Sequence, residues 1–516
     1  MRPTFLGFET QKRSLQLAQK HIDITGNNIS NINTPGYTRQ RVDLYAEYYM
    51  GNRDLRWSST TSSLSMAGQG ANAYGVSQIR DIYVDKRYRE NVAVEAQTET
   101  AVNILKDIED VLDNFESDGL QYFTQQFFNA LQDYSSEKPD SSEVATICVN
   151  TAKNLCRLLN DYSIKLKEVE TTYVNELEDT ISHINELTDE MNLLNDKIVK
   201  EKFHYPEGYD PNELIDEMNL YIDELATYGN IEVERHDSGA YSVKMGGVTI
   251  LDGENFRTNR LLMKEYDIYE QAIVYWESGD AYNVTSGSLN AYYNAINGNG
   301  VYASGYQNNY YGIAYFKTAV DEFARTIANT FNTANYADYD DFRAMFSAGE
   351  DGALITAGNI HVSDSWEQDP TMIGQVRRQN TMTGMYEYGY DEVTDANTGK
   401  VTLQNTNVLY LISQFDNSEL KFGTAHDFEG SVTEYISFIS NRLGQTIEYE
   451  DSRSETAQAT VDTLLDARDE VSAVSMDEEG INMLNYQKWY NASSRIVTTL
   501  DDLLDKLING TGRVGL

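Results

Sequence analysis

Cysteine and metal-binding residues are scarce in this chain. Its 516 residues include two cysteines, Cys148 and Cys156, and six histidines. The eight residues that separate the cysteines fall in a predicted helix and rise by about 12 Å, more than a disulfide can span. We therefore expect two free thiols, and no metal site, because no third cysteine or nearby histidine completes a ligand set.

Basic charge and long apolar runs are also scarce. The 40 Lys and Arg residues face 81 Asp and Glu residues, which gives a net charge of -41. Such an acidic chain repels nucleic acid and anionic lipid, so we expect neither as a partner. No stretch reaches the roughly 18 apolar residues of a membrane-spanning helix, and residues 1–30 contain no secretory apolar region.

Catalytic motifs are missing as well. The chain contains no HExxH, no GxxxxGK[ST] and no GxSxG, and Gly298 and Gly300 lack the third glycine of a dinucleotide-binding loop. The acidic cluster around Asp338, Asp340 and Asp341 lacks the register of a calcium loop, so solvated acid is the better interpretation. We predict that the protein is not an enzyme and uses no cofactor.

What the chain does contain is heptad periodicity at both ends. The amino-terminal row is Phe8, Leu15, Ile22 and Ile29. In the carboxy-terminal segment one row is Met483, Tyr490, Val497 and Leu504, and the other is Tyr486, Ser493, Leu500 and Leu507. Two helices with one narrow stripe each pack most simply on each other, although each could instead dock separately on a globular core. The amino-terminal helix should end in the Asn-rich stretch before Thr34, Pro35 and Gly36.

The middle of the chain is predicted to be a helical rod with a β-rich insertion. A heptad pattern from Tyr173 to Ile198 has the form of a third coiled-coil seam, and no proline interrupts a helix from about residue 142 to 200, roughly 85 Å long. Shorter helices are expected at 92–113, 119–134, 317–335, 428–442 and 454–470. Between 203 and 310, alternation in Ile231–Glu234 and Tyr241–Lys244 predicts a hairpin with its turn at His236–Gly239, and Val248–Leu251 predicts a second, joined through Asp252 and Gly253 to a strand from Phe256.

These patterns predict a mainly α fold, with terminal coiled-coil helices, a long helical rod domain and a small inserted β-rich domain. The expected domains are 1–57 with 472–516, 58–202 with 311–471, and 203–310. Residues 1–57 carry eight basic and five acidic side chains, and residues 477–516 carry four and six. Nearly neutral ends on an acidic body favour ends that pack against other copies, because like charge is costly at a crowded interface.

The two ends also resemble a known family. The stretch from Ile24 to Tyr37 (ITGNNISNINTPGY) resembles the signature of bacterial flagellar axial proteins, which are the rod, hook and hook-filament junction proteins. Thr38–Val42, Val474–Glu479, Leu484–Gln487 and Tyr490–Arg495 are similar to the hook-associated protein 1 family of junction proteins. In the middle, Gly119–Leu131 and His183–Ile198 follow the order of that family's helical domain.

The resemblance implies a structural, self-assembling protein that forms the junction ring between hook and filament. Its terminal helices would form an inner coiled coil that lines the export channel, with the rod outside it and the β domain facing outward. The implied partners are further copies of the chain, the hook protein, a second hook-filament junction protein, a flagellar export chaperone and the flagellar type III export apparatus. The implied location is extracellular, at the hook-filament junction, reached without a cleaved signal peptide.

Two sets of assembly residues follow from these positions. The inner coiled coil is expected to use Phe8, Leu15, Ile22, Ile29, Met483, Tyr490, Val497, Leu500 and Leu504. The signature turn is expected to use Asn28, Asn31, Pro35, Gly36 and Tyr37, both to shape the turn and to meet the adjacent subunit. The alternatives are a flagellar hook or rod protein, and a surface adhesin, since eighteen of the 37 tyrosines lie between residues 201 and 350.

Overall fold

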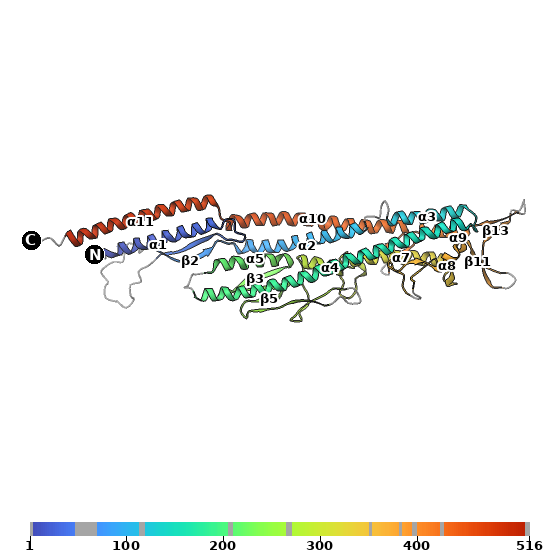
Figure 1. Ribbon diagram of the computed structural model, residues 1–516, viewed down its shortest axis with the longest axis horizontal. Coiled ribbons are helices and arrows are strands. Elements are labelled where there is room, and N and C mark those ends of the chain that lie inside the picture. Colours follow the sequence, from blue (N-terminus) through green and yellow to red (C-terminus); the bar gives the residue numbers. More distant parts are fainter. Residues whose placement is uncertain are drawn as a thin grey trace, which may run out of the picture.

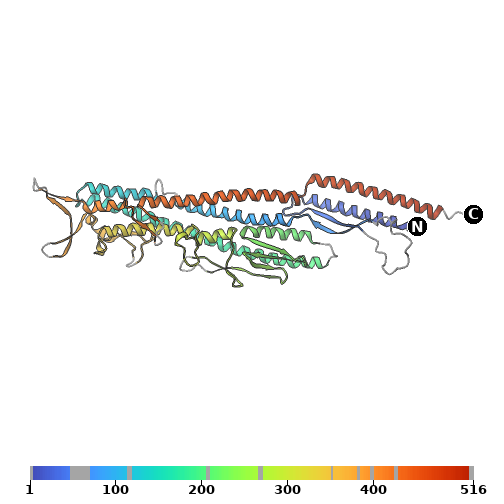
Figure 2. The ribbon, with the colours of Figure 1, turned by 180° about the vertical axis from the view of Figure 1, so that it is seen from behind.

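The computed structural model describes residues 4–46, 70–112, 119–204, 210–264, 271–349, 353–380, 384–394, 400–423 and 428–510. The molecule is elongated, and its long helices run close to one common axis (Figures 1 and 2). The expected domain boundary at residue 57 lies outside the described residues. The first and last helices lie side by side at one extremity, so residues far apart in sequence form one end of the molecule (Figure 1).

This extremity is the terminal layer, which consists of α1 (Thr4–Ser30), α11 (Met476–Gly510), β1 (Gln40–Ala46) and β2 (Ala71–Gln78). The two strands form an antiparallel ribbon that pairs Gln40 with Gln78 and Ala46 with Ala71. Helix α1 ends inside the Asn-rich stretch, as predicted, and a turn follows in which Gly36 adopts a φ of 75°. Only glycine adopts that backbone conformation without a steric penalty.

The rod contains α2 (Ile82–Leu112), α3 (Leu120–Ser136), α4 (Ser142–His204), α7 (Ile313–Ala334), α9 (Thr406–Phe415) and α10 (Val432–Ser472). The predicted long helix is confirmed as α4, whose 63 residues extend about 95 Å. Helices α2 and α10 run side by side along it (Figures 1 and 2). Helix α10 is one continuous helix where two were predicted, because Leu443, Glu450 and Ala457 keep the core-facing period and Arg453 pairs with the buried Glu450.

The core of the rod farthest from the terminal layer is aromatic. The ring of Phe127 on α3 lies 5.5 Å from that of Phe331, 5.7 Å from Phe415 and 6.4 Å from Trp366. Short elements surround this core: β9 (Phe346–Ser347), β10 (His361–Val362), α8 (Asp364–Gln368), β11 (Val376–Gln379), β12 (Tyr386–Gly389), β13 (Asp391–Thr394), β14 (Val401–Gln404), β15 (Lys421–Phe422), β16 (Phe428–Glu429) and the 3-10 turns at Asp341–Arg343 and Pro370–Gly374.

The other half of the rod carries the β-rich region. It contains α5 (Asn212–Tyr228), β3 (Ile231–Arg235), β4 (Tyr241–Met245), β5 (Val248–Asp252), β6 (Arg257–Thr258), β7 (Leu261–Lys264), β8 (Ile273–Trp276), α6 (Ser288–Asn297) and a 3-10 turn at Gly300–Tyr302. The first four strands form one antiparallel sheet in the order β3-β4-β5-β6, which confirms both predicted hairpins. Helix α5 was not predicted.

The heptad face of α4 has a different partner from the one that its pattern predicts. Leu177, Ile184, Met191 and Ile198 share a core with Ile222 of α5 and with the strands, rather than with a second long helix in a coiled coil. Strands β3 and β5 lie beside α4 and α5 in the same half of the molecule (Figure 1). This shared core crosses the expected boundary at residues 202 and 203, and the division into three domains stays a prediction.

Both cysteines are free and buried in the rod, as the sequence predicts. Burial raises the pKa of the Cys148 and Cys156 thiols to about 12. Since the thiolate is the reactive form, neither side chain reacts readily in the folded protein.

The aromatic core gives a stability prediction. Replacing Phe127 with alanine removes a fully buried ring and should lower the free energy of unfolding by about 3–5 kcal/mol. Tyr122→Ala, on the same helix and 42% exposed, should change it by about 0.5 kcal/mol or less. Thermal unfolding followed by circular dichroism measures both, and equal shifts for the two variants would contradict this packing.

Candidate assembly site: the terminal layer and its joint with the rod

The seam between α1 and α11 is built from small, polar and aromatic side chains. The hydroxyls of Ser14 and Ser493 lie 2.8 Å apart, and the indole N–H of Trp489 donates to Ser14 Oγ at 2.9 Å. Two turns further along α1, the ring of His21 stacks on Tyr486 with a centroid distance of 4.4 Å. Burial lowers the pKa of His21, so the neutral imidazole is favoured in this stack.

The residues of α1 that meet α11 keep the predicted heptad period but stand one position earlier. They are Gly7, Ser14, His21 and Asn28, each of which contacts a residue of α11. The residues predicted for this helix, Phe8, Leu15, Ile22 and Ile29, lie next to the seam and are half-buried. Apolar periodicity could not reveal a seam whose closest contacts are made by glycine, serine, histidine and asparagine.

On α11 the structure brings some predicted residues to the seam. Leu500 packs against Gly7, with its Cδ1 3.7 Å from where a Cβ would be, and the Met483 methyl lies 4.0 Å from the same point on Gly26. Val497 and Leu504 are half-buried, and Tyr490 is exposed. Further apolar side chains of α11 are exposed, namely Ile481, Leu484, Ile496, Leu503, Leu507 and Ile508.

At the other end of the seam, the buried amide of Asn28 connects four segments. Its Nδ2 donates to Gln40 O at 3.0 Å and to Glu479 Oε2 at 3.2 Å. Its Oδ1 accepts from the Gln40 N–H at 3.0 Å and from the Tyr37 hydroxyl at 2.9 Å. The amide therefore joins the end of α1, the signature turn, the start of β1 and the start of α11.

Arg39 completes this arrangement. Its guanidinium lies 2.7 Å from Glu479 Oε1 and 2.8 Å from Glu478 Oε2, and its backbone N–H donates to Ser472 O, the last residue of α10. Glu479 is buried, and a buried carboxylate requires such partners. We call Asn28, Arg39, Gln40 and Glu479 the Asn28 clamp.

The other residues predicted for the signature turn make contacts inside the subunit or face solvent. Asn31 donates to Asn27 O at 3.0 Å and accepts from Thr34 Oγ1 at 3.1 Å, whereas Pro35 is exposed. Gly36 packs on Leu220 of α5 so closely that a Cβ would lie 2.5 Å from Leu220 Cγ. Burial, together with the nearby Asp216, raises the pKa of Tyr37, which keeps its hydroxyl protonated for the bond to Asn28.

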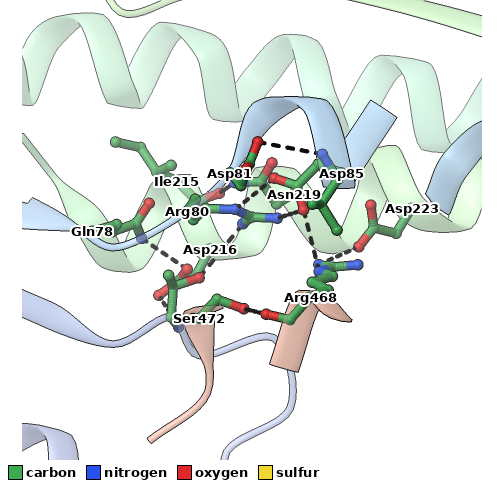
Figure 3. Close-up of polar contacts among 12 residues, drawn as sticks. Gln78, Arg80, Asp81, Asp85, Ile215, Asp216, Asn219, Asp223, Arg468 and Ser472 are labelled. Carbon is green, nitrogen blue, oxygen red and sulfur yellow. Dashed lines mark hydrogen bonds and ion pairs between the residues drawn. The ribbon is translucent and has the colours of Figure 1, made fainter. Parts of the chain in front are cut away.

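Beyond the clamp, a network of ion pairs joins three helices of the rod where the terminal layer begins (Figure 3). Arg468 of α10 lies 2.7 Å from Asp223 of α5 and 3.3 Å from Asp85 of α2. Arg80 pairs with Asp85 at 3.0 Å, and Arg89 pairs with Asp223 at 2.6 Å. We call these five residues the joint network. Each carboxylate serves two guanidinium groups, so no buried charge is left without a partner.

Asp216 connects this joint to the terminal layer. Its carboxylate accepts from the Gln78 amide of β2 at 2.8 Å and from the backbone N–H of Thr38 at 3.3 Å (Figure 3). Burial raises its pKa to about 6, an effect that hydrogen bonds from Thr38 and the charge of Arg80 only partly offset. Sequence reasoning did not single out Asp216 or the joint network, because their partners are far away in the sequence.

Among the described residues, no three or more His, Cys, Asp or Glu side chains are grouped in a way that could hold a metal ion. No helix of the described part of the chain is both long and apolar enough to cross a membrane.

Comparison with known proteins identifies the family. Residues 105–345 match the sequence model of the flagellar hook-associated protein FlgK helical domain. Residues 467–510 match the C-terminal region of flagellar basal body rod FlgEFG proteins, and residues 8–38 match the flagella basal body rod protein family. Flagellar hook-associated protein 1 of Bacillus subtilis is 29% identical, and the alignment covers 99% of each chain.

The chain is similar along its whole length to flagellar hook-associated protein 1, and its middle matches the FlgK helical domain. Flagellar hook-associated protein 1 of Escherichia coli is 21% identical over 96% of this chain and 98% of its own length. The flagellar hook junction protein FlgK from Burkholderia pseudomallei has the same fold, with a TM-score of 0.56 and 12% identity over 75% of this chain and 100% of that chain. The predicted resemblance and the mainly α fold class are confirmed.

The clamp gives a prediction about local stability. Asn28→Ala should leave the Gln40 backbone N–H and C=O without the Asn28 amide and remove one donor from Glu479, which keeps Arg39, at a cost of about 2–3 kcal/mol. Amide hydrogen exchange should therefore speed up in β1 and in the first turns of α11. The control is Asn33→Ala at an exposed position of the same stretch. Equal exchange in both variants would mean that the Asn28 amide does not hold these segments together.

Asp216 gives a prediction about pH. A folded-state pKa of about 6, above the ordinary value of 3.8, means that the folded protein binds this proton more tightly than the unfolded chain. The stability from this group is therefore complete below pH 3.8 and is lost as the pH rises through 6, by up to about 3 kcal/mol. Asp216→Asn should remove this component from the pH dependence of the unfolding temperature, whereas Glu217→Gln, at an exposed position of α5, should retain it. The same slope in Asp216→Asn as in the wild type would contradict the assignment.

Proposed function

We propose that this chain is a structural, self-assembling protein of the bacterial flagellum that forms the junction ring between hook and filament. The observation that carries the proposal is a terminal layer of the flagellar axial type on the helical domain of the hook-associated protein 1 family. The middle of the chain separates it from hook and rod proteins, because its match is to the FlgK helical domain.

The terminal layer is the part that assembles. The side chains of Leu484, Leu503 and Leu507 are each 57% exposed on α11, and the predicted row on α1 is only half-buried. A stripe of large apolar side chains on the surface of an isolated subunit favours an interface with other molecules. In a ring, copies on either side cover this stripe, so the predicted coiled-coil residues serve both the subunit and its contacts.

The charge distribution supports the same arrangement. The ends of the chain are nearly neutral although the whole carries a net charge of -41. Crowding the terminal layers at the centre of a ring therefore brings little like charge together, while the acidic rods point away from one another.

The proposed partners are other flagellar components. Above and below the ring these are the hook protein and a second hook-filament junction protein. Before assembly, an export chaperone covers the apolar face of α11, and the type III export apparatus delivers the chain to the outside without cleaving a signal. The role is mechanical, so we propose no catalytic activity and no cofactor; the relatives are hook-associated proteins.

Leu500 tests the proposal. Leu500→Asp places a charge against Gly7 in the seam, in place of an apolar side chain. In cells that lack the wild-type gene, we expect at least about tenfold fewer hooks with attached filaments, because the seam loses several kcal/mol.

The matched control is Leu409→Asp, at a 58% exposed position of α9 far from the terminal layer. It should support normal numbers of filaments, and circular dichroism should show that the rods of both variants are folded. Normal filament numbers with Leu500→Asp would show that the seam is not needed for assembly.

A further inference from the structure

Among the described residues, one edge of the four-stranded sheet has no partner strand. Strand β3 is an edge strand, because it stands at one end of the order β3-β4-β5-β6. Its even-numbered positions face β4, since Asn230 O accepts from Gly246 N at 3.1 Å and His236 N donates to Ala240 O at 2.9 Å. Because the direction of backbone groups alternates along a strand, the N–H and C=O groups of Ile231, Val233 and Arg235 point away from β4, to the free edge.

The free edge faces a cavity of about 760 Å³. All five residues of β3 line it, and the opposite walls come from β2 and the start of α2 and from α5. Ile82, Ile215, Ile231 and Val233 give the cavity an apolar strip beside the open edge. Proteins usually cover or shorten such edges, and a strand edge above a cavity can accept an extended segment as a further strand.

The charge of the side chains that line this cavity indicates which kind of extended segment could bind there. Its lining has five basic and four acidic side chains, so it is nearly neutral in a chain of net charge -41. A strongly charged peptide of either sign gains little there. The lining favours an extended, nearly neutral segment with some large apolar side chains.

The β1-β2 ribbon has these properties. Its only charged residues are Arg41 and Asp43, which pair at 3.4 Å, and it exposes Leu44 at 48%, Tyr45 at 46% and Tyr74 at 56%. Within the part of the chain that the structure describes, the outer edge of each strand of this ribbon has no sheet partner. The end of the ribbon at Ser77 and Gln78 borders the cavity of its own chain, so the ribbon and the cavity lie in the same half of the molecule.

We propose that β3 of one copy binds the β1-β2 ribbon of a second copy, with β1 added to the sheet as a further strand. The contact joins two different surfaces, so it repeats from copy to copy, as the subunits of a ring require. The inference rests on the proposed self-assembly and adds to it a specific contact outside the terminal helices.

Cysteine cross-linking tests the contact in assembled flagella. Both native cysteines are buried, so introduced thiols are the reactive ones. Cells should produce the full chain with Glu234→Cys on β3 and Tyr45→Cys on β1, at positions that are both exposed. A short bismaleimide should convert at least about a tenth of the chain into covalent multimers of this protein.

Two kinds of control make the outcome decisive. Each single variant, and Tyr45→Cys combined with Tyr410→Cys at a 54% exposed position of α9, should give no multimers. Adding Val233→Pro, which removes a free-edge N–H, should reduce the cross-link at least fivefold, whereas Val233→Thr should leave it unchanged.

Counting the filaments attached to the cells distinguishes a failure of this inference from a failure of the proposed function. If the double variant carries filaments but yields no multimers, or cross-links to another protein instead, the contact between β3 and β1 is wrong and the junction role stands. If cells without this chain still attach their filaments, the proposed function is wrong.

Discussion

The buried amide of Asn28 sets the geometry on which the rest of the terminal layer depends. Its two donor and two acceptor bonds are satisfied by Gln40, Glu479 and Tyr37, so the end of α1, the signature turn, β1 and α11 can meet in one arrangement only. A buried polar group that loses its partners costs more free energy than the bond itself contributes. The clamp therefore stabilises the terminal layer and also determines how α1, the signature turn, β1 and α11 are arranged.

The clamp also determines how the terminal layer attaches to the rod. Arg39 joins Glu479 to the end of α10 through its backbone bond to Ser472, and one residue earlier the Thr38 N–H donates to Asp216 of α5. The joint network then ties α5, α2 and α10 together. An adaptor that transmits force requires its assembling end to be firmly joined to its body, and charge-assisted hydrogen bonds are among the strong polar contacts available.

Periodicity and turn chemistry predicted much of the fold. Helices α1, α4 and α11 follow from their heptad rows, and the hairpins of β3, β4, β5 and β6 follow from alternation and turn residues. Helix α5 was missed although Ile215, Met218, Ile222 and Leu225 keep a helical spacing, because the glycine and tyrosine content around it drew attention to strands. Helix α10 was predicted as two helices, and the buried position between them is occupied by Glu450, which apolar periodicity does not detect.

The contacts of the terminal layer could be predicted only in part, because many of them join residues that are far apart in the sequence. Asn28 lies in the signature that the sequence reveals, but its partner Glu479 is 451 residues away in the chain. On α1, Gly7, Ser14 and His21 contact α11, and the part that the apolar row takes in the seam stays a prediction. Apolar patterns locate a helix face, whereas polar contacts between distant segments become visible only in three dimensions.

The central claim is that this protein attaches the filament to the hook. The most direct measurement is to delete its gene in the native cell, image the surface by electron microscopy and assay the medium for flagellin. We predict finished hooks that carry no filaments, together with monomeric flagellin released into the medium. Normal filaments on the deletion strain would contradict the claim, and an absence of hooks would place the protein in the hook or rod instead.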